Sequence, residues 1–166
     1  MSHPSVPADV PPDFLSAVEV LNTKSRLDIE DMKLMILLET AGEPLYAKLA
    51  ALAPNAEAAD LLNRNGREET AHAHRLKKAI ELLTGAPFEI PPLEANPYAD
   101  PIAVGELSVE LLEAFRAGET AGDESYQRYA DAESNPEVAA LLRQNGREET
   151  RHGERVGRVI EILSEF

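Results

Sequence analysis

Apolar residues recur at three- and four-residue spacing along most of this chain, and leucine and alanine dominate them. Such spacing places apolar side chains on one face of a helix, so it predicts helices rather than strands. A short extra helix is predicted over residues 13–21, after a loose tail over 1–11. The long helices are expected near residues 25–52, 56–84, 106–133 and 137–164.

Capping signals mark the ends of these helices. Asn135 precedes Pro136, and asparagine is a favourable N-cap residue while proline fits the first helical position. Asn55, followed by Glu57 near the positive end of the helix dipole, repeats this logic in the first half. Gly85 stands where a helix should end. Each half of the chain is therefore predicted to be a helical hairpin.

The two halves are copies of one unit. Residues 39–80 align with residues 119–160 at an offset of 80 without a gap, and 20 of the 42 aligned positions are identical. Identity at that level is far beyond chance, and two copies indicate a duplication rather than a repeat array.

A proline-rich segment separates the copies, with five prolines between residues 85 and 104. It is predicted to be an extended crossover, long enough at ~3.3 Å per residue to run the length of a bundle. Two hairpins with such a connection predict an all-α four-helix bundle with an internal pseudo-two-fold axis. The expected organisation is a tail over 1–24, which includes the short helix, and a bundle over 25–166, made of hairpins 25–84 and 106–165 and crossover 85–105.

Composition narrows the possible functions. The chain has 166 residues, enough for one domain, and no cysteine, which excludes disulfides, thiolate nucleophiles, iron–sulfur clusters and a rubredoxin module. Its net charge of −14 argues against nucleic-acid and anionic-membrane partners and favours cations. No apolar run reaches the ~20 residues of a membrane span, and the first residues do not resemble a signal peptide. A cytoplasmic location is the default expectation.

Six residues go beyond what a plain bundle requires. Glu69 and His72 form a Glu-x-x-His pair that points to one side of a helix, and Glu149 and His152 repeat it in the second copy. Glu39 lies 15 residues before the break at 54 and Glu69 lies 15 after it, so an antiparallel hairpin brings them to one level. Glu119 and Glu149 flank position 134 in the same way, so the second hairpin brings these two to one level as well. The six candidate metal ligands are Glu39, Glu69, His72, Glu119, Glu149 and His152.

Four carboxylates at the bundle centre would be costly without compensation, because each buried charge loses several kcal/mol of hydration. Two divalent cations supply +4 against −4. The oxygen-rich donor set without thiolate favours iron or manganese over structural zinc. The sequence therefore predicts a dimetal centre.

This ligand pattern resembles that of the ferritin-like di-iron carboxylate superfamily, and within it the rubrerythrin-like and bacterioferritin-like proteins, over roughly residues 25–165. The resemblance implies two iron ions, with Glu69 and Glu149 bridging them. Glu39 and Glu119 would be terminal ligands, and each histidine would cap one metal. Rubrerythrin-type sites carry a further glutamate three residues after the third-helix ligand, where this chain has Gly122.

Further residues are predicted to support the ligands. The resemblance implies that Tyr46 and Tyr126, seven residues after the terminal glutamates, hydrogen-bond a ligand carboxylate or donate an electron; core tyrosines are the other interpretation. Glu68 and Glu148 lie four residues before the histidines and are predicted to hold an imidazole N–H of a facing helix, rather than to be solvated. No catalytic residue beyond the metal ligands is identified.

Four functional hypotheses follow. The first is an oxidoreductase that oxidises Fe(II) with hydrogen peroxide or dioxygen, of ferroxidase or peroxide-reductase type, with electrons from an external donor or further Fe(II). The second is non-enzymatic iron binding, storage or delivery. The third is a metal-free or zinc-filled structural bundle, which the sequence disfavours because all six candidate ligands are present. The fourth is an oxygenase that acts on an organic substrate, which would need an apolar pocket that the sequence does not reveal. The resemblance also implies a homodimer.

Overall fold

The computed structural model describes residues 3–100 and 102–166; residues 1, 2 and 101, in the predicted tail and crossover, lie outside the described residues. The described part is entirely helical, without strands, which confirms the all-α bundle prediction. Its elements in chain order are α1 (Phe14–Asn22), α2 (Ile29–Ala51), α3 (Ala56–Thr84), the 3-10 helix η1 (Leu93–Ala95), α4 (Val109–Ala132) and α5 (Pro136–Leu163).

Helices α2 and α4 begin three to four residues later than the apolar spacing predicts, because polar side chains set their starts. The Asp28 side chain accepts a hydrogen bond from the Asp31 amide, and the Asp31 side chain accepts one from the Asp28 amide, which forms a capping box. Ser108 caps α4 through the amide of Leu111. Gly85 ends α3 in the left-handed region at φ 69°, as its type predicts.

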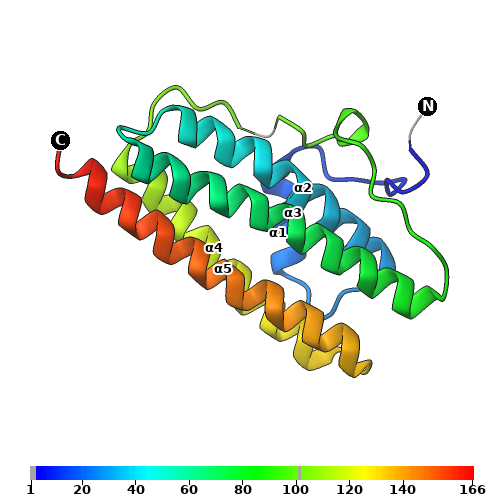
Figure 1. The fold of residues 1–166 in the computed structure, drawn as a ribbon. Helices are drawn as coiled ribbons and strands as arrows, with labels where there is room; N and C mark the ends of the chain where they lie inside the picture. The colour runs from blue at the N-terminus through cyan, green and yellow to red at the C-terminus, as the bar shows by residue number, and fades with distance from the viewer. Residues whose placement is uncertain (1–2, 101) are drawn as a thin grey trace.

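The four long helices form two antiparallel hairpins, α2 with α3 and α4 with α5 (Figure 1). Helices α3 and α5 make the main contact between the hairpins, whereas among the described residues α2 and α4 are scarcely in backbone contact. Helix α1 contacts both α2 and α4 and so connects these two helices. The crossover runs along the bundle from the end of α3 to the opposite end, where α4 begins (Figure 1).

A polar layer divides the interior into two apolar clusters. The larger cluster includes Met32, Leu76 and Leu142, and the smaller includes Leu49, Leu62 and Val159. Between them lie buried glutamates, histidines and asparagines, which are uncommon in a bundle core. Among the described residues, no helix is long and apolar enough to cross a membrane.

Candidate metal centre

All six predicted ligands meet in the polar layer at the middle of the bundle. Glu39 comes from α2 and Glu119 from α4, while each Glu-x-x-His pair lies on α3 or α5. The four glutamates are each 7% exposed, and both histidines are fully buried. A spacing of three residues keeps each pair on one helix face. The buried centre of the bundle therefore brings four carboxylates and two imidazoles together.

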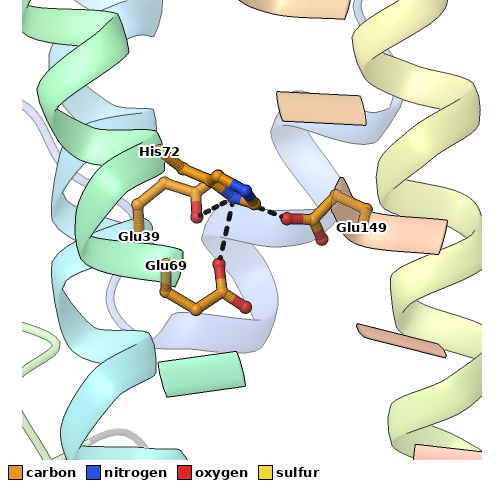
Figure 2. A group of neighbouring side chains, drawn as sticks. All are labelled: Glu39, Glu69, His72 and Glu149. Atoms are coloured by element: carbon orange, nitrogen blue, oxygen red, sulfur yellow. Dashed lines mark ion pairs between the residues drawn. The ribbon is translucent and has the colours of Figure 1, made fainter. Parts of the chain in front are cut away.

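Three carboxylates from three helices surround a single nitrogen of His72. Its Nδ1 lies 2.8 Å from Glu149 Oε1 and 3.4 Å from both Glu39 Oε2 and Glu69 Oε2 (Figure 2). One imidazole nitrogen can donate at most one proton, so hydrogen bonding alone does not explain three acceptors around it. A cluster of carboxylate oxygens around an imidazole nitrogen is typical of side chains that together bind one metal cation.

His152 has the corresponding surroundings in the second copy. Its Nδ1 lies 3.4 Å from Glu69 Oε1, 3.7 Å from Glu119 Oε2 and 3.9 Å from Glu149 Oε1. The two imidazole rings stack at a centroid distance of 5.2 Å and an interplanar angle of 14°. The pseudo-two-fold axis therefore passes between the two histidines.

The six donors form two overlapping groups, each with ligand atoms within 4.8 Å of one another. Glu69 and Glu149 belong to both groups, whereas the other two glutamates and each histidine belong to one. Two cations held by these groups would share two carboxylates, as the predicted bridging roles require. The groups are Glu39, Glu69, His72 and Glu149, and Glu69, Glu119, Glu149 and His152.

The unpaired polar atoms of the site fit bound metal. Both nitrogens of His72, both nitrogens of His152 and Oε1 of Glu149 are buried without a hydrogen bond of acceptable geometry. Buried polar atoms in folded proteins are almost always paired. Imidazole nitrogen and carboxylate oxygen together suit iron, manganese or zinc. The residues present therefore fit two divalent cations.

The pKa values of the buried glutamates and histidines show how strongly the site favours positive charge. Burial and the charge of Glu69 raise the pKa of Glu39 to about 8. Burial, then Glu119 and Glu69, raise the pKa of Glu149 well above its usual range. Burial opposes a charged His152, but the carboxylates of Glu119 and Glu69 raise its pKa to about 9. Protons therefore supply charge that bound cations would otherwise provide.

Two tyrosines hydrogen-bond Glu39 and Glu119, each across to the other hairpin. Tyr46 on α2 donates its hydroxyl hydrogen to Glu119 on α4, and Tyr126 on α4 donates to Glu39 on α2. Burial, then the charge of the glutamate that each contacts, raises both hydroxyl pKa values well above the usual range, so both remain donors at neutral pH. Each hydrogen bond links the two hairpins at the level of the site.

Arginine and asparagine residues that the sequence analysis did not select brace the histidine helices. Asn145 donates to the backbone carbonyl of His72 at 3.2 Å, and Arg75 donates to Asn145 Oδ1 at 3.0 Å. Asn65 and Arg155 make the same contacts, at the same distances, on the His152 side. The sequence does contain a signal for these four residues: both asparagines and both arginines are identical in the two copies, and asparagine is unfavourable inside a long helix.

The predicted supports Glu148 and Glu68 differ in their placement. Glu148 Oε1 lies 3.3 Å from His72 Nε2, and Arg75 holds both oxygens of Glu148, at 2.8 and 3.0 Å. Interaction with His72, and then with Arg75, lowers the pKa of Glu148 to about 2. Glu68 receives a hydrogen bond from Arg155 at 2.7 Å, but no ion pair joins it to His152 in the described structure. Among the described residues, a carboxylate lies within ion-pair distance of the distal nitrogen Nε2 of His72 but not of His152.

Close helix approach explains two glycines at the site. A Cβ at residue 42 would lie 2.9 Å from Cγ of Glu69, and one at residue 122 would lie 2.8 Å from Oε2 of Glu149. The Glu149 carboxylate therefore occupies the space beside Gly122 that a side chain at this position would need. Glu43 hydrogen-bonds Thr70 at the surface, away from the cluster.

Fold and site together define a class: a helical bundle with a buried carboxylate–histidine site that could hold two metal ions. The model of the rubrerythrin family matches residues 30–160. The chain therefore belongs to the rubrerythrin family, a family of di-iron carboxylate proteins. No curated protein and no solved structure matches the chain in the corresponding comparisons.

Proposed function

We propose that this protein binds two iron ions at its central site and oxidises Fe(II) with hydrogen peroxide or dioxygen, as a ferroxidase or peroxide reductase. The observation that carries this proposal is the pair of overlapping four-residue groups that share Glu69 and Glu149. Membership of the rubrerythrin family supports iron as the metal. The unpaired imidazole nitrogens support occupancy of both positions.

The ligand roles follow from membership of the two groups. Glu39 and His72 would hold one ion, and Glu119 and His152 the other, while Glu69 and Glu149 would contribute to both. Two Fe(II) ions bound there would supply the two electrons that, with two protons, convert hydrogen peroxide to two water molecules.

The chain itself contributes position and charge. The hydroxyls of Tyr46 and Tyr126 each donate to one oxygen of a terminal carboxylate, which restricts how that carboxylate can turn. Two apolar clusters lie on either side of the layer, so the carboxylates and imidazoles are largely surrounded by apolar side chains. Surroundings of low polarity strengthen the attraction between carboxylates and cations.

Stopped-flow absorbance tests this function. The protein is loaded anaerobically with two equivalents of Fe(II) and mixed with one equivalent of hydrogen peroxide or of dioxygen. We expect fast iron oxidation in the natural protein and its loss in Glu69→Ala and Glu149→Ala. Glu43→Ala, at an exposed glutamate four residues after Glu39, is the matched control and should oxidise iron at the natural rate.

The outcome separates the candidate activities. A faster reaction with peroxide supports peroxide reduction, and a faster reaction with dioxygen supports ferroxidase chemistry. Two bound irons that neither oxidant oxidises faster than free Fe(II) would contradict the enzyme and leave iron binding, storage or delivery. Size-exclusion chromatography then tells a storage cage from a small iron-delivery protein.

A further inference from the structure

The open face between α2 and α4 contains a cavity of about 420 Å³ that ends on the proposed metal ligands. Its inner wall includes all four central glutamates. Cavities of ~300–1,000 Å³ accommodate organic ligands. Hydrogen peroxide and dioxygen have only two heavy atoms each and are far smaller than this cavity. For comparison, a water molecule occupies ~30 Å³ in the liquid. The proposed oxidants leave most of this volume without a role.

The remaining walls of the cavity are almost wholly apolar. Phe14 of α1, Met35 of α2 and Phe115 of α4 represent them. The two lining tyrosines already donate their hydroxyl hydrogens to glutamates, and Asn22 accepts a hydrogen bond from Ser125. Apart from the glutamates, no charged side chain is among the described residues that line the cavity. These walls favour an uncharged, apolar molecule, and the carboxylates disfavour an anion.

Differences between the two copies widen the cavity on the α4 side. Positions that carry Leu34 and Leu38 in α2 correspond to Ala114 and Gly118 in α4, at the offset of 80. Ala114 and Gly118 both line the cavity, and a Cβ at residue 118 would meet no other atom within 4 Å. Small residues of α4, where the repeat predicts leucine, therefore leave this side of the cavity open.

We propose that this cavity binds an uncharged, largely apolar organic molecule, alkyl or aromatic, with its inner end against the glutamates of the metal site. Burial of apolar surface would drive this binding. The molecule would lie beside the carboxylates that hold the metals, where it governs access of an oxidant to them. A small molecule fits better than a protein segment because the cavity extends inward to side chains that are only 7% exposed. This inference goes beyond iron oxidation and does not depend on it.

Fluorescence and NMR test the binding on the full chain, both metal-free and loaded with Zn(II). The probe is N-phenyl-1-naphthylamine, an uncharged dye that fluoresces in apolar surroundings. We expect saturable binding of one dye per chain. With ¹³C-methyl methionine labelling, Met35, which lines the cavity, should shift, while the buried Met32, which does not line it, should shift much less.

A filling substitution provides the second test. Gly118→Leu introduces the residue that the first copy has at the equivalent position, Leu38. The leucine side chain should take up space that the dye would otherwise occupy and weaken dye binding by roughly tenfold or more. Ala117→Leu adds the same side chain at an exposed neighbour outside the cavity lining and should bind the dye like the natural protein. Gly118→Ala controls for the higher helix propensity of a non-glycine residue.

Specific results would overturn the proposal. One is a Met35 methyl NMR signal that does not shift when the dye is added. Another is equal dye binding by Gly118→Leu and Ala117→Leu. The third is a dimer whose formation excludes the dye, since a second copy would then cover the cavity. If Gly118→Leu fails to fold, as judged by circular dichroism, the methionine shifts decide alone. Failure of iron oxidation would leave these results unaffected, because no measurement here uses iron.

Discussion

The two copies of the repeat agree at the ligands and differ around them. Each contributes one glutamate that belongs to a single donor group, one Glu-x-x-His pair, and one tyrosine that reaches across to the other copy. Yet Glu148 contacts the distal nitrogen of His72, whereas Glu68 pairs with Arg155 and Arg64. In addition, α4 carries Gly118 where α2 carries Leu38. The comparison teaches that the donor set is symmetric while its support and its access are not.

Glu69→Ala and Glu149→Ala should have the largest effect, because both residues belong to both donor groups. We expect each substitution to reduce the metal content from two ions per chain to nearly none. Glu39→Ala and Glu119→Ala remove a member of one group only and should leave about one ion, held by the other group. Metal analysis after anaerobic loading and desalting gives the counts. Equal loss in all four variants would contradict the shared roles of Glu69 and Glu149.

Glu148→Gln and Glu68→Gln should separate the two halves. Loss of a group that supports a metal-bound histidine typically costs about 10–100-fold in metal affinity. We expect a loss in that range at one of the two metal positions for Glu148→Gln, since Glu148 contacts His72 at 3.3 Å. Glu68→Gln should cost less. Competition titration against a fluorescent chelator measures both affinities, and a larger loss in Glu68→Gln would reverse the asymmetry.

Gly42→Ala and Gly122→Ala should sharpen the comparison through stability. The new methyl at residue 42 would press on Cβ and Cγ of Glu69, which are close to the backbone, so the helices must shift. At residue 122 it would press on the carboxylate end of Glu149, which can rotate. We expect Gly42→Ala to lower the free energy of unfolding by about 1–3 kcal/mol, and Gly122→Ala by less. Urea denaturation of the metal-free proteins measures both, with Gly118→Ala as the control that meets no atom.

Tyr46→Phe and Tyr126→Phe should have the smallest and most equal effects. Each removes one hydrogen bond to a terminal carboxylate, worth about 1 kcal/mol, or roughly a fivefold change in the affinity of one metal. Equal changes are expected because the two contacts are related by the pseudo-two-fold axis. Isothermal titration with Mn(II) provides the measurement. A clear difference between the two variants would show that the tyrosines are inequivalent.

The sequence predicted the parts that depend on periodicity and repetition. Helical spacing and the offset of 80 were enough to bring Glu39, Glu69 and His72 to one level. Helix starts were less accurate, because Asp28 and Ser108 override the apolar pattern by capping.

The difference between the two sides of the site could not be predicted, because it depends on how the two copies pack. Repeat symmetry alone predicts equal roles for Glu68 and Glu148, and only the packing of α3 on α5 shows that they differ. The apolar cavity likewise arises from the separation of α2 and α4. By contrast, the matched asparagines and arginines at 65, 145, 75 and 155 were visible in the repeat and could have been selected.

The central claim is that two metal ions share Glu69 and Glu149. Its most direct test is an anaerobic Fe(II) reconstitution, followed by oxidation, with iron counting and electron paramagnetic resonance on one sample. We predict two irons per chain and almost no signal from isolated Fe(III), because carboxylate bridges couple the two spins. One iron per chain, or two with the full signal of uncoupled Fe(III), would contradict the shared ligands.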